Sequence, residues 1–162
     1  MLDPLPPARH HIFLLDTAAG ISARVRRARI WRFTMTVRTP IRVVAVVDDD
    51  QGILQSLEYL LESADYAVRL FASAAALLDS GCLAEIDCLI SDVDMPGTDG
   101  FELVRLVRSA RPTLPIILIT GYPDRLTRLP PLGGSHPRLF TKPFQGHELL
   151  EAVSEALRNA GK

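Results

Sequence analysis

Apolar runs and segments with helical spacing alternate along the chain from residue 41 onward. The run 41–47 (IRVVAVV) is rich in β-branched residues, which is typical of a strand buried on both faces. In 51–63, isoleucine and leucines recur three and four residues apart, which predicts an amphipathic helix. By the same criteria we predict strands over 66–71, 86–91, 115–119 and 138–141, and helices over 74–79, 101–109 and 145–159.

This order of elements predicts an α/β fold built on a doubly wound parallel sheet. Parallel neighbours need a crossover connection, usually a right-handed one through a helix, so helices are expected on both faces. In open sheets of this kind, ligands bind beyond the carboxyl ends of the strands. Reactive side chains at the strand ends are therefore the first candidates for a functional site.

Polar side chains do follow four of the predicted strands. They are Asp48, Asp49 and Asp50 after the first strand, Asp92 at the third, Thr120 at the fourth and Lys142 at the fifth. Carboxylates at one edge repel each other, by about 4 kcal/mol for a pair roughly 4 Å apart at an effective dielectric constant of about 20. A divalent cation relieves this repulsion, and oxygen ligands of this kind suit Mg²⁺. The sequence therefore predicts an acidic magnesium site beside a hydroxyl and an ammonium group.

Four motifs occupy these strand ends: VVDDD at 46–50, DVDMPGTDG at 92–100, ITG at 119–121 and KPF at 142–144. With these motifs in this order, the region 41–162 resembles the receiver domains of bacterial two-component response regulators, nearest to the FixJ-like kind. The resemblance covers about three quarters of the chain. It implies a flavodoxin-like (βα)5 fold with strand order 2-1-3-4-5, Mg²⁺ as cofactor, and a signalling role in a phosphorelay.

The resemblance also implies a role for each motif residue. Asp92 would accept a phosphoryl group from a histidine kinase or a histidine phosphotransfer protein. Thr120 would donate a hydrogen bond to that group, and Lys142 would pair with its charge. The metal ligands would be the carboxylates of Asp49 (directly), Asp48 (largely through water) and Asp92, and the backbone carbonyl of Asp94. A cis bond is expected between Lys142 and Pro143.

Phosphoryl transfer to a carboxylate suits these residue types. In-line transfer needs a nucleophile, a metal ion that neutralises the equatorial oxygens, and a positioned cation. A carboxylate is ordinarily ionised near neutral pH and needs no neighbouring base. The product, an aspartyl phosphate, is a reactive mixed anhydride, so the modification is temporary, as a signal requires.

The segment 122–141 departs from the receiver pattern. Two prolines and two glycines within 130–134 disfavour a regular fourth helix, so at most one or two turns are expected around 124–129. Three positions before Lys142, where receivers usually carry Tyr or Phe, this chain has Leu139, and Phe140 should point to the opposite face. We therefore predict that phosphorylation works but that its readout differs from that of a dimerising transcription factor, with the protein a monomer or weak dimer.

The net charge of −1 conceals a division along the chain. Residues 1–40 hold seven arginines and two acidic residues, a net charge of +5, whereas residues 41–162 hold 11 basic and 17 acidic residues, a net charge of −6. We interpret 1–40 as a basic extension that is either disordered or a misassigned stretch upstream of a natural start at Met35. A basic arm that contacts nucleic acid, a membrane or an acidic partner is the alternative, although no aromatic–basic interleaving or helix-turn-helix pattern supports it.

The remaining features favour a cytoplasmic protein with no membrane or nucleic-acid partner. Cys82 and Cys88 match no metal or redox spacing and are expected to be small buried side chains. The histidines also lack ligand spacing and are expected at the surface: His10, His11, His136 and His147. No apolar run approaches the roughly 18 residues of a membrane span, and the N-terminus lacks the pattern of a secretory signal.

Two readings of the function stay open at this point, beside the basic arm already considered, and a third is disfavoured. The chain ends soon after the predicted last helix, so we expect a stand-alone receiver with a downstream protein partner that the sequence does not identify. A phosphorylation-independent interaction module with a receiver fold is the main alternative, favoured by the broken fourth helix and Leu139. An enzyme is not expected: Asp92-Val93-Asp94 has the DxD form of haloacid-dehalogenase-type phosphatases, but Pro96 stands where that motif has threonine.

Overall fold

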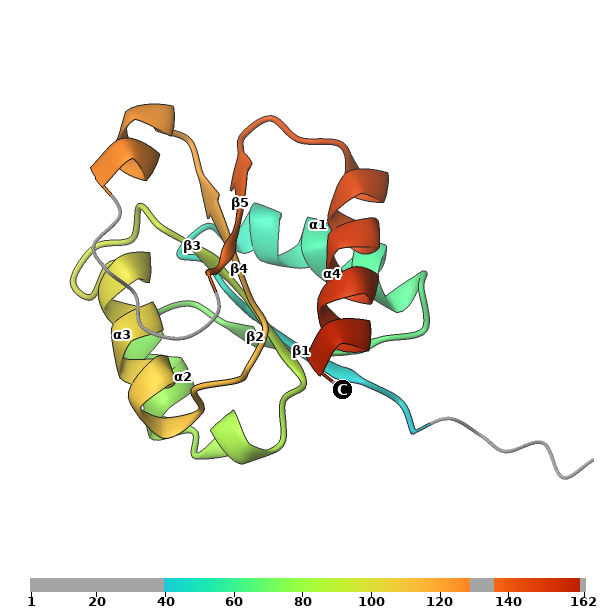
Figure 1. Ribbon diagram of the computed structural model, residues 1–162. Coiled ribbons are helices and arrows are strands. Elements are labelled where there is room, and N and C mark those ends of the chain that lie inside the picture. The colour runs from blue at the N-terminus through green and yellow to red at the C-terminus, as the bar shows by residue number, and fades with distance from the viewer. Residues whose placement is uncertain (1–39, 129–135, 161–162) are drawn as a thin grey trace, which may run out of the picture. The chain divides into compact units, whose positions relative to one another are not determined.

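The computed structural model describes residues 40–128 and 136–160, in which five parallel strands form one sheet (Figure 1). The strands are β1 (Val43–Val47), β2 (Ala67–Phe71), β3 (Cys88–Asp92), β4 (Ile116–Thr120) and β5 (Arg138–Thr141). Their order across the sheet is β2-β1-β3-β4-β5. The predicted flavodoxin-like α/β fold with strand order 2-1-3-4-5 is therefore confirmed.

Four α-helices in the described residues cover both faces of the sheet (Figure 1). They are α1 (Gln51–Glu62), α2 (Ala74–Asp79), α3 (Gly100–Ala110) and α4 (Gly146–Ala160). Alternate residues of β1 pack into two separate cores: Val44 and Val46 with α1 and α4, Ala45 and Val47 with α2 and α3. All four are 0% exposed, so β1 is buried on both faces, as its unbroken apolar run predicts.

Short polar side chains cap the N-termini of three helices. Asp50 accepts hydrogen bonds from the backbone N–H groups of Gly52 (2.7 Å) and Ile53 (3.1 Å) at the start of α1. Ser73 caps α2 as predicted, and Asp99 caps α3 in the same way. Asp50 is therefore used to begin a helix, which separates its role from that of the two aspartates before it.

Gly100 allows the start of α3 to lie directly against the end of β3. A Cβ atom at this position would be 2.5 Å from the carbonyl oxygen of Asp92 and 2.8 Å from Cα of Val93. Both neighbours are backbone atoms, which cannot rotate away. The glycine that ends the DVDMPGTDG motif is therefore required by the close approach of helix and strand at the position of Asp92.

The first and third strands both begin two residues later than predicted, at Val43 and Cys88. The preceding Asp87 uses its carboxylate to accept hydrogen bonds from the backbone N–H of Val43 and from Arg42, both at 2.8 Å. Asp87 also donates its backbone N–H to the carbonyl oxygen of Val43 at 2.8 Å, so it binds the beginning of β1 through both its side chain and its backbone. An apolar-run criterion does not detect this kind of contact, because it depends on the neighbouring strand.

Between β4 and β5 the described structure holds a 3-10 helix, η2 (Pro123–Arg128), where receivers have a regular fourth helix; residues 129–135 lie outside the described part. The expected one or two turns are thus present. Leu139 packs with the α2 and α3 side of the sheet, and Phe140 packs with the α1 and α4 side, where its ring contacts Phe144 (centroids 5.9 Å apart). The predicted opposite orientation of Leu139 and Phe140 is confirmed.

Several smaller expectations are also met. Cys82 and Cys88 are buried free thiols, and His136 and His147 are exposed. His10, His11 and the whole basic segment 1–39 lie outside the described residues. Within the described ranges, no helix has the length and apolar character needed to cross a bilayer.

Candidate functional site

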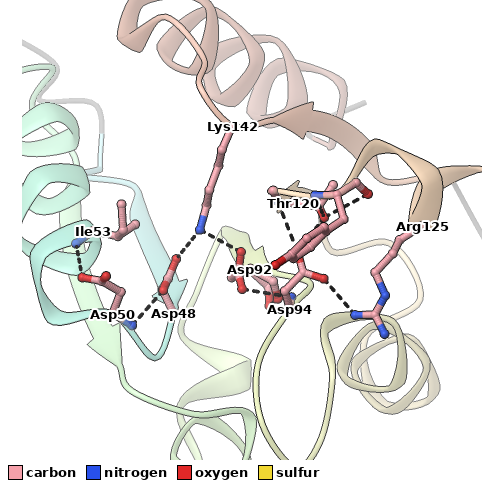
Figure 2. Close-up of polar contacts among 11 residues, drawn as sticks. Asp48, Asp50, Ile53, Asp92, Asp94, Thr120, Arg125 and Lys142 are labelled. Atoms are coloured by element: carbon pink, nitrogen blue, oxygen red, sulfur yellow. Dashed lines mark hydrogen bonds and ion pairs between the residues drawn. The ribbon is translucent and has the colours of Figure 1, made fainter.

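Asp92 is the last residue of β3, between β1 and β4 in the middle of the sheet. Its side chain is 4% exposed, and Oδ2 accepts a hydrogen bond from the backbone N–H of Asp94 at 2.9 Å. The ammonium nitrogen of Lys142 lies 2.9 Å from Oδ1 (Figure 2). The sheet thus brings a lysine from the end of β5 to an aspartate 50 positions earlier in the chain.

Two further carboxylates come from the end of β1. Asp48 is buried and lies 3.3 Å from the same ammonium group, whereas Asp49 is exposed. Carboxylate oxygens of Asp48, Asp49 and Asp92 all lie within 4.8 Å of one another. The structure therefore assembles the predicted acidic cluster, with Lys142 beside it.

Burial and charge act in opposite directions within this cluster. Burial raises the pKa of Asp48, assisted by the charge of Asp92, against the opposing effects of the Asp50 N–H group and Lys142. Burial alone would lower the pKa of Lys142, but its close contacts with Asp92 and Asp48 outweigh burial and raise the pKa. Lys142 is therefore held in its charged form, while Asp48 is ionised only at a cost in free energy.

The donor set fits a hard divalent cation. Three carboxylate groups offer oxygen atoms close enough to share one ion, which is the ligand type that Mg²⁺ prefers. Oδ1 of Asp92 is a buried oxygen with no hydrogen-bond donor in suitable geometry among the described residues, although Lys142 lies near it. A metal ligand needs an oxygen lone pair that is not already occupied by a hydrogen-bond donor. The excess of negative over positive charge in the cluster also favours a cation.

Thr120 and Asp94 interact with each other, which the sequence did not predict. Thr120 ends β4, is fully buried, and donates its hydroxyl hydrogen bond to Oδ2 of Asp94 at 2.7 Å. The same oxygen accepts from the N–H of Gly121 at 3.2 Å, and Arg125 binds the other oxygen at 2.8 Å (Figure 2). From the sequence, only the backbone carbonyl of Asp94 was expected at the site, as a metal ligand, and Arg125 was not expected there. No motif spacing signals where these two side chains point.

These contacts stabilise the ionised form of Asp94. Burial works to raise its pKa, but the hydrogen bonds from Thr120, Arg125 and Gly121 together lower the pKa below its ordinary value.

The peptide bond between Lys142 and Pro143 is cis, as predicted.

The comparisons with known proteins agree with this geometry. The sequence model of the response regulator receiver domain matches residues 44–154. The chain belongs to the response regulator receiver domain family. Receivers are signalling modules that are phosphorylated on an aspartate, bind Mg²⁺ at an acidic pocket and interact with histidine kinases or phosphotransfer proteins.

Curated relatives place this receiver near the FixJ kind. The transcriptional regulatory protein FixJ of Bradyrhizobium diazoefficiens is 34% identical over 117 residues, which are 72% of this chain and 57% of FixJ. The response regulator protein TodT of Pseudomonas putida is 34% identical over 118 residues, which are 73% of this chain and 52% of TodT. The chain therefore spans about half the length of the curated relatives it matches.

Solved structures show the same receiver fold. The receiver domain of an HD domain-containing protein from Pseudomonas fluorescens is similar with a TM-score of 0.68 at 31% identity, covering 75% of this chain and 98% of that one. Full-length FixJ from B. japonicum is similar with a TM-score of 0.64 at 35% identity, covering 74% of this chain and 59% of that one. The predicted FixJ-like receiver is therefore confirmed at the level of family and fold.

Proposed function

We propose that this receiver is switched by phosphorylation of Asp92. The observation that supports it is the set of neighbours of this buried carboxylate: an ammonium group 2.9 Å away and two aspartates whose oxygens lie within 4.8 Å of its own. Other carboxylates at the strand ends are committed elsewhere, Asp50 to a helix cap and Asp94 to Thr120. Asp92 combines a metal-binding position with a nearby cation.

In the proposed reaction, a carboxylate oxygen of Asp92 forms a bond to phosphorus while the bond between phosphorus and the donor breaks. With a phosphohistidine donor the P–N bond breaks and the imidazole leaves; with acetyl phosphate a P–O bond breaks and acetate leaves. A carboxylate attacks without losing a proton first, so the site needs no general base. Mg²⁺, when bound, supplies positive charge near the transferred oxygens.

The neighbouring residues have distinct roles in this proposal. Asp49 would hold the ion directly and Asp48 largely through water, and the carboxylate of Asp92 and the backbone carbonyl of Asp94 would be the remaining protein ligands. Lys142 already lies at ion-pair distance from Asp92 and would bind an oxygen of the phosphoryl group. The hydroxyl of Thr120 is directed to Asp94 in this structure and would turn to the phosphoryl group after transfer.

Phosphotransfer from acetyl phosphate tests the proposal. With Mg²⁺ present, intact-mass spectrometry should show the addition of one phosphoryl group to the parent protein and none to Asp92→Asn. The label should be lost with hydroxylamine, which cleaves acyl phosphates, and chelation of Mg²⁺ should prevent its formation. A label that persists in Asp92→Asn, or that resists hydroxylamine, would refute the assigned acceptor.

The oligomeric state tests the predicted change in readout, and partner binding distinguishes the proposal from an interaction module that works without phosphorylation. The short η2 and Leu139 lead us to expect a monomer or weak dimer with and without the phosphoryl mimic beryllofluoride. Light scattering would measure this, and strong dimerisation induced by the mimic would contradict the predicted change in readout. A partner that binds the parent and Asp92→Asn equally well, whether phosphorylated or not, would favour the interaction module.

Three finer statements stay predictions. They are the division into a basic extension, 1–40, and a receiver domain, 41–162; the action of this receiver without an output domain; and its cytoplasmic location. Immunoblotting of the natural product in cell fractions, followed by mass measurement, would test all three. A natural product of about the length of FixJ would contradict the prediction that this receiver acts without an output domain.

A further inference from the structure

The side chain of Asp94 is held by donors from two consecutive segments. Thr120 Oγ1 lies 2.7 Å and Gly121 N lies 3.2 Å from Oδ2, both at the end of β4. Arg125 Nη1 lies 2.8 Å from Oδ1 and belongs to η2. One carboxylate from the loop after β3 thus connects the Thr120 hydroxyl to η2 (Figure 2). We call these residues (Asp94, Thr120, Gly121 and Arg125) the Asp94 clasp.

The clasp uses the one proton that Thr120 can donate. A threonine hydroxyl has a single O–H donor, and Asp94 Oδ2, at 2.7 Å, is the nearer of its two acceptors here, since the carbonyl oxygen of Tyr122 lies 3.4 Å away. A phosphoryl group on Asp92 would offer strong acceptor oxygens close by, because the carboxylate of Asp92 already lies 2.9 Å from the backbone nitrogen of Asp94, which donates a hydrogen bond to it. Thr120 can therefore serve either Asp94 or the phosphoryl group, but not both.

Electrostatic repulsion also favours the move of the Thr120 hydroxyl from Asp94 to the phosphoryl group. A phosphoryl group adds a charge of about −1.5 to −2, and it would lie near the carboxylate of Asp94. The clasp also has room to open: Asp94 and Arg125 border a surface hollow of about 680 Å³ next to Tyr122, and the Arg125 side chain is 45% exposed. Release of Thr120 would leave the Gly121 N–H and Arg125 as the remaining donors to Asp94.

We infer that Asp94 is a positioning residue that occupies the Thr120 hydroxyl in the unphosphorylated protein and must release it when Asp92 is phosphorylated. This inference rests on the proposed function of Asp92. The clasp is an internal competitor of the phosphoryl group, and it opposes the switched state until phosphorylation displaces it.

Affinity for beryllofluoride, measured with Mg²⁺ in excess, tests the competition. Asp94→Ala removes the competitor, so it should bind the mimic about tenfold more tightly than the parent, the ratio expected for one charge-assisted hydrogen bond. Asp94→Asn keeps the shape but lacks the charge and should give a smaller change in the same direction. Glu102→Gln, which breaks an exposed carboxylate–arginine pair with Arg105 on α3, is the matched control and should leave the affinity unchanged.

A double-mutant cycle separates the clasp from simple charge repulsion. If Asp94 acts through Thr120, the tightening caused by Asp94→Ala should largely disappear in a Thr120→Val background. An equal tightening in both backgrounds would overturn the inference, because it would show that only the charge of Asp94 matters. Tightening of the Glu102→Gln control to the same extent would overturn it as well.

The amide resonance of Gly121 provides an independent readout. In the parent this N–H donates to Asp94, so its ¹H–¹⁵N signal in Asp94→Ala should move toward the position that the parent reaches with beryllofluoride. A purely structural role of Asp94 would shift signals without this direction.

The failure of the inference and the failure of the proposed function are distinguishable. If the parent does not bind beryllofluoride at all, the proposed function of Asp92 fails and the clasp with it. If the parent binds the mimic and Asp94→Ala and Asp94→Asn bind it no more tightly, only the inference fails.

Discussion

At the scale of single residues, the site contains buried charges that lower the stability of the fold. Asp48 is 3% exposed, and its carboxylate faces Asp92 as well as Lys142. The ammonium group offsets part of the negative charge, but it is shared between two carboxylates. A buried ion that is only partly compensated lowers stability, and it is retained where function needs it.

This argument predicts that Asp48→Asn stabilises the protein without metal. Burial raises the pKa of Asp48, so the folded state holds its proton more tightly than the unfolded chain does. The folded protein therefore loses stability as pH rises from the ordinary pKa of aspartate through the raised value. Chemical denaturation with EDTA near neutral pH should show a gain of about 1–2 kcal/mol in the free energy of unfolding of Asp48→Asn.

The pH dependence supplies the check. The gain should vanish in acid, below the ordinary pKa of aspartate, because Asp48 is then protonated in both states. Glu151→Gln, which removes an exposed acid on α4, is the control and should change the stability by less than about 0.5 kcal/mol. A loss of stability in Asp48→Asn near neutral pH would contradict the account of this carboxylate.

Most acidic residues of the site could be predicted from their position after strands, because parallel strands end at one edge whatever the side chains are. Asp48, Asp49 and Asp92 do come together in this way. The clasp around Asp94 could not be predicted, because it depends on the direction of a side chain in a loop and on Arg125 in η2. The direction of the Asp94 side chain and the position of Arg125 are set by tertiary contacts between distant segments, since Asp94 and Arg125 are separated by 31 positions.

At the scale of the elements, the contact of α3 with β3 fixes the backbone around the acceptor. Gly100 begins α3 where a side chain would meet two backbone atoms of the Asp92 and Val93 region. The same region holds Asp92 in place through the hydrogen bond from Val93 N to Ile119 O at 2.8 Å. The end of β3 is thus confined between β4 and the first turn of α3.

We expect Gly100→Ala to be destabilising by about 1–3 kcal/mol, the usual effect of an atom forced into a packed contact. Its Cβ would lie 2.5 Å from the Asp92 carbonyl oxygen, so α3 has to shift away from β3. Gly121→Ala is the matched control, because a Cβ there has no heavy atom within 4 Å. Equal midpoints for the two variants in urea denaturation would contradict the proposed contact.

The type and order of the elements followed from hydrophobic periodicity, but their details did not. Periodicity identified every strand and α-helix of the described residues, including the edge strands β2 and β5, whose side chains are only partly buried or exposed. It placed the starts of β1 and β3 two residues early. It predicted the loss of a regular helix after β4 from proline and glycine, but not that a 3-10 helix would present Arg125 to Asp94.

At the scale of the whole molecule, metal binding should be linked to the stability of the fold. An ion that binds the folded protein alone adds RT ln(1 + [L]/Kd), which is about 2.7 kcal/mol at roughly 100 times its Kd. Saturating Mg²⁺ should therefore raise the Tm by roughly 5–15 °C. The effect should be absent from Asp49→Asn and kept in Asp79→Asn, which changes an exposed aspartate on α2. An equal shift in both variants would show that Asp49 is not a ligand.

The central claim is that the receiver accepts a phosphoryl group on Asp92, and direct mapping of the modified residue tests it. After reaction with acetyl phosphate and Mg²⁺, borohydride reduces an aspartyl phosphate to homoserine, which tandem mass spectrometry of the peptides then locates. The account predicts homoserine in place of Asp92 and unchanged Asp48, Asp49 and Asp94. Homoserine at any of those three positions, with Asp92 intact, would contradict it.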